Sequence, residues 1–356
     1  MRFKAIIDWA LLIPAVLLTF LGISVLFNFS GPNDFALKQG VWMLVSVGVY
    51  ILTSLVDFNF LKNSRFLLTL FFVTTLALLF VFVLGQAVKG AQSRFYILGF
   101  AVQPADPAKL VLIAVLAKYF SRRHMEIAHI KHILISGLYA LILFLLVALQ
   151  PDLGSALMIA SVWFFVVLLS GISKKHLFGL ISIGFTGSLL AWNLLLKDYQ
   201  KDRILVFLDP LKDLQGAGYN AYQSLVAVGS GGLWGKGIGF GTQSKLNFLP
   251  EYQTDFIFAA FAEEWGFVGV IILFTLFAAL IFRILNMGAK SHDNFVRLFS
   301  IGVAALFLTH FTVNVGMNIG LLPITGITLP FVSYGGSHLL TEYLALGILT
   351  SLSRKT

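Results

Sequence analysis

The sequence contains no cysteine and few charged residues, and these two absences exclude several classes of protein. Without cysteine the chain has no disulfide bond, no thiolate nucleophile and no cysteine-ligated metal. Charged residues make up 12% of the chain, against about 25% in a soluble domain. The mean hydropathy is +0.90. The 356 residues therefore indicate a membrane protein with little length left for a soluble domain.

Acidic residues are scarcer than basic ones, with 16 Asp and Glu against 25 Lys and Arg. In a soluble protein a net charge of +9 would suggest a nucleic-acid partner. In a membrane protein the same excess reflects cations in the cytoplasmic loops, so we expect no nucleic acid. The seven histidines show no spacing typical of metal ligands.

Long apolar runs are abundant, and each is close to the roughly 20 residues that a transmembrane helix needs. They lie at 9–27, 36–56, 66–84, 104–120, 133–149, 155–171, 177–196, 255–283, 296–321 and 334–352. No small-residue cleavage pattern follows the first run, which we interpret as a retained span. The sequence therefore predicts an all-α polytopic membrane protein of ten transmembrane helices, with residues 1–356 forming one membrane domain.

The positions of the loop cations predict the orientation of these helices. With a cytoplasmic N-terminus, 15 cations lie at inner helix ends and three, Lys38, Lys89 and Arg94, lie in short outer loops. This asymmetry satisfies the positive-inside rule. We therefore expect both termini to be cytoplasmic and the long segment 197–254, between helices 7 and 8, to be a large extracellular loop that is partly re-entrant.

Within that segment, residues 229–241 are rich in glycine and could present backbone amides to an anion, with Lys236 and Lys245 adding charge. The stretch is not a Walker A loop, because Ser230 stands at the first glycine position and Gly237 follows the lysine. Flexible turns in an outer loop are the alternative interpretation.

Ionisable residues inside a membrane are costly and are candidates for function. Most of them fall in the predicted outer half of the helices, which favours a polar site that opens outward. Lys109 follows Asp106 by three residues, so the two share a helix face and could form a structural ion pair. Asp152 could equally cap the sixth helix. Asp255 directly precedes the eighth helix, where a carboxylate could be a cap or a general base.

Seven separated motifs resemble the SEDS (shape, elongation, division and sporulation) family, in the order of that family and across nearly the whole chain. They are KGAQSRF (89–95), QPADPAKL (103–110), QPDLGSA (150–156), GSGGLWGKG (229–237), FLPEYQTDFIF (248–258), AEEWGFVG (262–269) and GLLPITGITLPFVSYGGS (320–337). Gln150 makes the chain more similar to the elongation branch of the family than to its division branch. Four positions depart from the family pattern: Phe95, Asp106, Gln253 and His338.

The resemblance implies a peptidoglycan glycosyltransferase that polymerises lipid II, releases undecaprenyl diphosphate and works in cell elongation and cell shape. Asp255 falls on the catalytic aspartate of the family. We expect substrate to be bound by Arg94, Lys109, Asp152, Lys236, Lys245, Glu251, Ser333 and Ser337, with support from Asp106 and Gln253. The implied partners are lipid II, membrane lipids and a class B penicillin-binding protein, in the bacterial inner (plasma) membrane.

Two other functions are compatible with a ten-helix protein of this composition. A lipid II flippase would also need a polar cavity, although it would favour inverted repeats and charges near the bilayer midplane. A scaffold that only positions a penicillin-binding protein would need no catalytic carboxylate. The metal content is unknown from the sequence: a divalent cation, Mg or Mn, bridging the diphosphate to Asp106 or Asp152 is neither required nor assigned.

Overall fold

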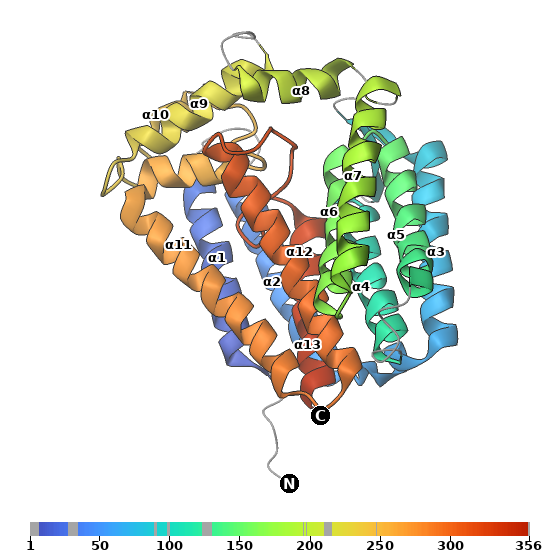
Figure 1. Cartoon of the computed structure of the whole chain (residues 1–356). Helices are drawn as coiled ribbons and strands as arrows, with labels where there is room; N and C mark the ends of the chain where they lie inside the picture. The colour runs from blue at the N-terminus through green and yellow to red at the C-terminus, as the bar shows by residue number, and fades with distance from the viewer. Residues whose placement is uncertain are drawn as a thin grey trace.

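A computed structural model describes residues 7–27, 35–88, 91–97, 100–122, 130–194, 196, 198–209, 216–246 and 248–354. Its long helices form one bundle (Figure 1). They are α1 (Trp9–Leu26), α2 (Phe35–Leu55), α3 (Ser64–Leu84), α4 (Ala105–Ser121), α5 (Ile130–Leu149), α6 (Leu153–Leu169), α7 (Lys174–Leu194), α11 (Ile257–Lys290), α12 (Asn294–Asn318) and α13 (Gly336–Arg354). Each coincides with one of the predicted apolar runs, which confirms the all-α polytopic class.

Seven of the described helices are long and apolar enough to cross a membrane, namely α1, α2, α3, α5, α7, α11 and α12. Helices α4 and α6 are each 17 residues long, and α13 carries Glu342 and Arg354. The count of ten crossings therefore stays a prediction. None of the residues of α7, all of which are described, is buried, and a helix so apolar and so exposed is stable only in lipid.

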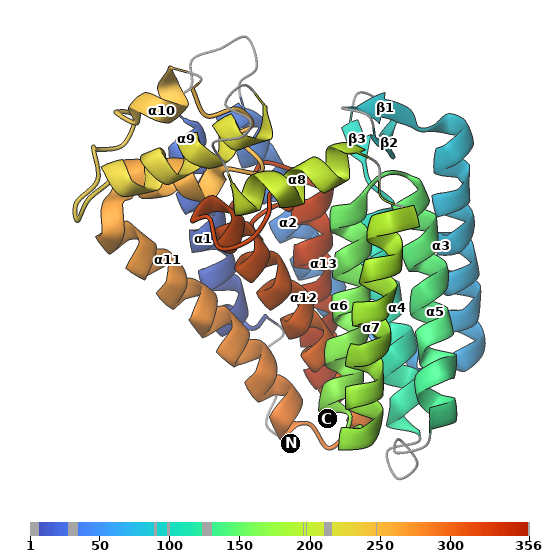
Figure 2. The same ribbon diagram turned by 45° about the horizontal axis from the view of Figure 1, so that its top comes forward.

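Shorter elements gather at one end of the bundle, which we call the loop end. Helices α8 (Asp198–Leu208), α9 (Ala217–Ser230) and α10 (Thr242–Lys245) lie across it (Figure 1). A three-stranded antiparallel sheet of β1 (Gln86–Val88), β2 (Ala91–Ile97) and β3 (Phe100–Val102) lies at the same end (Figure 2). The sequence did not predict this sheet, because two of its strands have only three residues and leave almost no alternating pattern.

The core of the bundle lies along α4, which is buried on nearly every side by α3, α6 and α12. Helix α1 packs against α11, and α2 packs against α13. At the opposite end, where α13 ends, Asp8 caps α1 and also accepts hydrogen bonds from the Arg283 side chain at 2.5–3.1 Å. A short 3₁₀ helix, η1 (Phe58–Lys62), ends nearby at Lys62, which forms a 2.6 Å ion pair with Asp293.

The orientation of this bundle in the membrane is testable because the chain has no cysteine of its own. Of the cations behind the predicted orientation, Arg2, Lys4, Lys89, Arg123 and Lys355 lie outside the described residues. Two exposed positions at opposite ends are Ser230, at the end of α9, and His292, between α11 and α12. We expect Ser230→Cys to react with a membrane-impermeant maleimide in intact spheroplasts and His292→Cys to react only after lysis. The reverse pattern would contradict the orientation.

Candidate active site

Asp255 lies in the turn 251–256 that leads into α11 at the loop end. It is half-buried, and its amide donates a 3.1 Å hydrogen bond to the carbonyl of Glu251. Glu251 itself has a positive φ of 52°, an uncommon conformation for a residue other than glycine. A methyl group at Gly326 would lie 3.5 Å from Oδ2 of Asp255, so this carboxylate faces the irregular segment between α12 and α13.

Two asparagines of α12 hold the main chain at Asp255. Nδ2 of Asn314 and Nδ2 of Asn318 each donate to the Asp255 carbonyl at 3.0 Å. Asn314 also donates to the carbonyl of Ile327 at 2.7 Å, and Oδ1 of Asn318 accepts from the amide of Ala259. Both asparagines are fully buried. They join the start of α11 to the segment that precedes α13.

That segment makes two further hydrogen bonds to the Asp255 turn and one to α2. Ser333 Oγ donates to the carbonyl of Thr254 at 2.7 Å, and the Tyr334 amide donates to the carbonyl of Gln253 at 2.8 Å. The Ser333 carbonyl accepts from Nε2 of Gln39, on α2, at 3.1 Å. The turn is therefore fixed through its main chain.

Four of the sequence-predicted residues thus meet in one place: Asp255, Glu251, Gln253 and Ser333. Oε2 of Glu251 lies 3.3 Å from the Thr254 hydroxyl and 3.5 Å from Nε2 of Gln253. Burial raises the pKa of Tyr252, and the negative charge of the neighbouring Glu251 carboxylate raises it further. This phenol therefore stays protonated at neutral pH.

Asp152 and Ser337 meet at Gln103, between the sheet and α4. Oδ1 of Asp152 accepts from the Ser155 amide at 3.0 Å, so the aspartate caps α6, the alternative that the sequence had left open. Its Oδ2 accepts from Nε2 of Gln103 at 2.8 Å. The Gln103 amide in turn donates to Ser337 Oγ at 3.3 Å. These contacts connect the beginnings of α4, α6 and α13.

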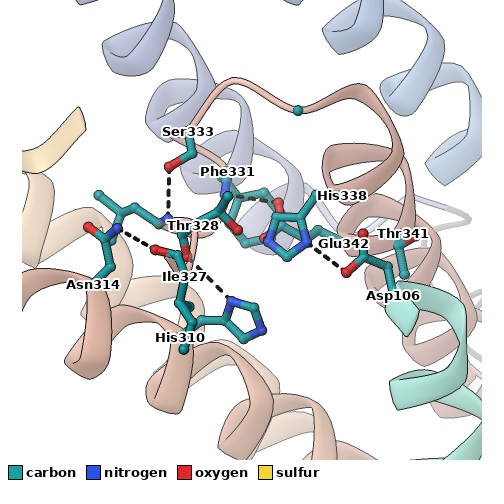
Figure 3. A network of polar contacts seen from close by, with 12 residues as sticks. Asp106, His310, Asn314, Ile327, Thr328, Phe331, Ser333, His338, Thr341 and Glu342 are labelled. Atoms are coloured by element: carbon teal, nitrogen blue, oxygen red, sulfur yellow. Dashed lines mark hydrogen bonds and ion pairs between the residues drawn. The ribbon is translucent and has the colours of Figure 1, made fainter. Parts of the chain in front are cut away.

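Asp106 and Lys109 form a buried ion pair on α4, with Nζ and Oδ1 at 3.0 Å and side chains only 6% and 3% exposed. Asp106 also lies 3.4 Å from Nδ1 of His338 on α13 (Figure 3). The structural pair expected as one alternative is therefore present, and neither side chain is free.

Amides of the glycine-rich stretch bond the main chain of α11, so anion binding by the stretch stays a prediction for its other amides. Helix α11 breaks at Gly266, where φ is 65°, and bends there (Figure 1). The amides of Phe267 and Val268 donate to the carbonyls of Gly232 and Leu233 at 2.9 and 3.1 Å. The Lys236 and Gly237 amides donate to the carbonyls of Glu263 and Glu264 at 3.0 and 3.1 Å. The stretch therefore supplies the hydrogen bonds that the break removes from α11.

The three remaining predicted cations lie in different settings. Lys236 forms a 2.7 Å ion pair with the fully buried Glu263, so binding a diphosphate would require this pair to exchange. Lys245, at the end of α10, and Arg94, on β2, are exposed. In the described part of the chain no group of three or more acidic or histidine residues could hold a metal ion. Asp106 and Asp152 already have protein partners, so we derive no step through Mg or Mn.

The sequence analysis missed the residues that hold the turn, although it contained a signal for them. His310, Asn314 and Asn318 recur every four residues along α12, which puts three polar groups on one face of an otherwise apolar helix. They were passed over because each, taken alone, looks like an isolated polar residue.

The comparisons with known proteins agree with this arrangement. The FtsW/RodA/SpoVE family, described as cell cycle proteins, matches residues 3–356. The chain belongs to this family. It is 39% identical over 287 residues to the peptidoglycan glycosyltransferase MrdB of Escherichia coli strain K12, which covers 80% of the chain and 76% of the relative.

Solved structures of family members share the fold. One is from a study of the coordination of polymerisation and crosslinking by a peptidoglycan synthase complex; it has 30% identity and a TM-score of 0.83, and covers 98% of both chains. Another is the rod shape determining protein RodA of Thermus thermophilus, with 29% identity and a TM-score of 0.70, covering 98% of this chain and 97% of that one. A multi-pass membrane protein of this family is therefore the framework for the site.

The close approach of the glycine-rich stretch to α11 predicts the effect of adding a methyl group. At Gly235, where φ is +79°, a Cβ would lie 2.0 Å from the carbonyl oxygen of Glu264. We expect Gly235→Ala to lower the free energy of unfolding by about 2 kcal/mol or more. Gly229→Ala is the matched control, since a Cβ there would meet nothing within 4 Å. Thermal unfolding in detergent measures both, and equal midpoints would contradict the role assigned to Gly235.

Proposed function

We propose that the chain polymerises lipid II into glycan strands as a peptidoglycan glycosyltransferase, with Asp255 as its general base. Membership of the family and the names of its relatives support the activity. The observation that supports the base is the fixed main chain of Asp255: its amide and its carbonyl are both hydrogen-bonded, and its carboxylate faces the segment around Gly326.

In the proposed reaction Asp255 removes the proton from the 4-hydroxyl of the acceptor's terminal GlcNAc. The hydroxyl oxygen attacks the anomeric carbon of the donor MurNAc from the side opposite the diphosphate. The bond from that carbon to the diphosphate breaks, so an α-linked donor becomes a β-linked product and undecaprenyl diphosphate leaves. A base held by its backbone keeps its position as the substrate reacts, which favours proton transfer in the transition state.

Two exposed cations at the loop end would favour the departing diphosphate. The side chains of Arg94 and Lys245 each carry a full positive charge there. Helices both begin and end at this end of the bundle (Figures 1 and 2), so the partial charges of their termini, positive at a start and negative at an end, do not decide its sign. We propose these two, rather than the paired Lys236, as the cations that the diphosphate meets first.

The proposed setting is the bacterial inner membrane, with both termini cytoplasmic and residues 197–254 outside the cell. The partner would be a class B penicillin-binding protein, which crosslinks the strands that this chain makes. The similarity to a chain from a peptidoglycan synthase complex over nearly its whole length supports such a partner.

Two alternatives, a lipid II flippase and a non-catalytic scaffold, are separated from the enzyme by two assays, polymerisation in detergent and lipid transport in liposomes. The purified chain is mixed with lipid II in detergent with no other enzyme present. We expect glycan strands, detected as a ladder on a gel. Transport of lipid II across liposomes without polymer would favour the flippase, and neither activity would favour the scaffold.

The role of Asp255 is tested by Asp255→Asn, which keeps the shape of the side chain and removes its charge. General bases typically contribute about 10²–10⁴-fold, so we expect polymerisation to fall by about that factor while the unfolding midpoint and lipid II binding stay unchanged. Asp202→Asn, on the exposed face of α8, is the matched control and should retain full activity. Normal polymerisation by Asp255→Asn would overturn the assignment.

A further inference from the structure

A second polar cluster lies inside the bundle and has no part in the reaction described above. Figure 3 shows four of its members, Asp106 on α4, His310 on α12, and His338 and Glu342 on α13. Lys109 on α4 is the fifth. These side chains line a cavity of about 10 Å³, which is the size of a single water molecule. A sugar or a phosphate group does not fit, so the cluster acts on the reaction through the structure around it.

His338 stands between two carboxylates. Its Nδ1 lies 3.4 Å from Oδ1 of Asp106, and its Nε2 lies 3.0 Å from Oε1 of Glu342. The second contact has the distance of an ion pair but not the angle of a hydrogen bond. Nε2 of His338 and Oε1 of Glu342 are therefore buried atoms that are joined by charge and not by a hydrogen bond. Two ring nitrogens that face two carboxylate oxygens both carry a proton only when the ring is an imidazolium.

The charges of the cluster also indicate that His338 is an imidazolium. Asp106 and Glu342 contribute two negative charges and Lys109 one positive charge, so a neutral His338 would leave one uncompensated carboxylate. Glu342 is only 4% exposed, and a buried charge without a counter-charge is strongly unfavourable. His310, whose ring lies 5.1 Å from that of His338, faces the carbonyl of Thr328 with Nδ1 at 3.3 Å and is accounted for as a neutral donor. Among the described residues, the other polar group that lines the cavity is Thr341, which is uncharged.

A short chain of contacts runs from this histidine to the Asp255 turn. Oε2 of Glu342 accepts from the Phe331 amide at 2.9 Å. Phe331 has a positive φ of 64°, a conformation that a bulky residue keeps only when its surroundings hold it. The adjoining Ser333 accepts from the Leu329 amide at 2.8 Å and donates to the Thr254 carbonyl, next to Asp255.

We propose that His338 is a positioning residue, which as an imidazolium between Asp106 and Glu342 keeps the 327–333 segment, and through it the Asp255 turn, in the reactive geometry. This inference rests on the proposed function, since positioning matters for catalysis only if Asp255 is the base. Without the imidazolium, Glu342 loses its counter-charge, and its hydrogen bond to the amide of the strained Phe331 is weakened. The effect then reaches the turn through Ser333.

The test replaces a charge and then restores the balance. His338→Gln leaves Glu342 without a counter-charge, whereas the double variant His338→Gln/Glu342→Gln is neutral again and keeps an oxygen acceptor for the Phe331 amide. Since coupled buried charges are non-additive, we expect the single variant to lose about tenfold or more in kcat with KM within about threefold. The double variant should recover to within about threefold of the original kcat. His176→Gln, a half-buried histidine at the start of α7, is the matched control.

Amide hydrogen exchange gives a readout that does not depend on catalysis. In His338→Gln we expect faster exchange at 329–333 and at 251–256, and exchange as in the original protein in the double variant and in His176→Gln. Faster exchange in His338→Gln together with normal activity of Asp255→Asn would show that Asp255 is not the base although His338 does hold the turn. Failure of the proposed function can therefore be told apart from failure of the positioning role.

Three results would overturn the inference. One is full activity and unchanged exchange in His338→Gln. Another is a double variant no more active than the single one, which would show that charge balance is not what His338 provides. If the single variant does not fold, the double variant is compared directly with the original protein, and an inactive or unfolded double variant contradicts the proposal.

Discussion

The main-chain carbonyl of Asp255 accepts hydrogen bonds from two buried asparagine side chains, and the order of the loop end depends on this junction. A buried carbonyl without a donor costs about 1–3 kcal/mol, and irregular backbone survives inside a membrane protein only where other groups satisfy it. Asn314 and Asn318 meet this requirement from one face of α12. They fix the start of α11 and the segment before α13 against the same helix, so three separate stretches of the chain share one geometry.

The same constraint explains the other irregular backbone at this end. The break of α11 at Gly266 would leave amides and carbonyls unpaired, and the 231–241 stretch pairs with them in both directions. Glycine is required there because the two backbones approach so closely; a Cβ on Gly231 would lie 2.0 Å from the Ala262 carbonyl oxygen. Glu263 then ties the stretch down from its buried position by accepting from Lys236 and from the Gln243 amide. A loop that looks adaptable from its composition is therefore a fitted part of the helix that it covers.

The sequence predicted the helices well because an apolar run of about 20 residues has few alternatives to a membrane helix. It also predicted that Asp106 and Lys109 share a face and that Asp152 stands at a helix start, since both follow from local spacing. It did not predict the strands, the break at Gly266 or the contact of His338 with Asp106. The last two depend on contacts between residues distant in the chain: His338 and Asp106 are 232 residues apart. The partners of the glycine amides could not be predicted for the same reason, because only the fold shows which carbonyls they meet.

The most direct test of the central claim is a structure of the protein with a lipid II analogue bound as acceptor and a non-transferable donor beside it. We expect the acceptor 4-hydroxyl oxygen about 2.6–3.2 Å from a carboxylate oxygen of Asp255, with the Asp255 carbonyl still held by Asn314 and Asn318. The donor diphosphate should lie on the far side of its anomeric carbon from that hydroxyl. An acceptor hydroxyl that instead meets another carboxylate, such as Glu251, while Asp255 points away, would contradict the mechanism.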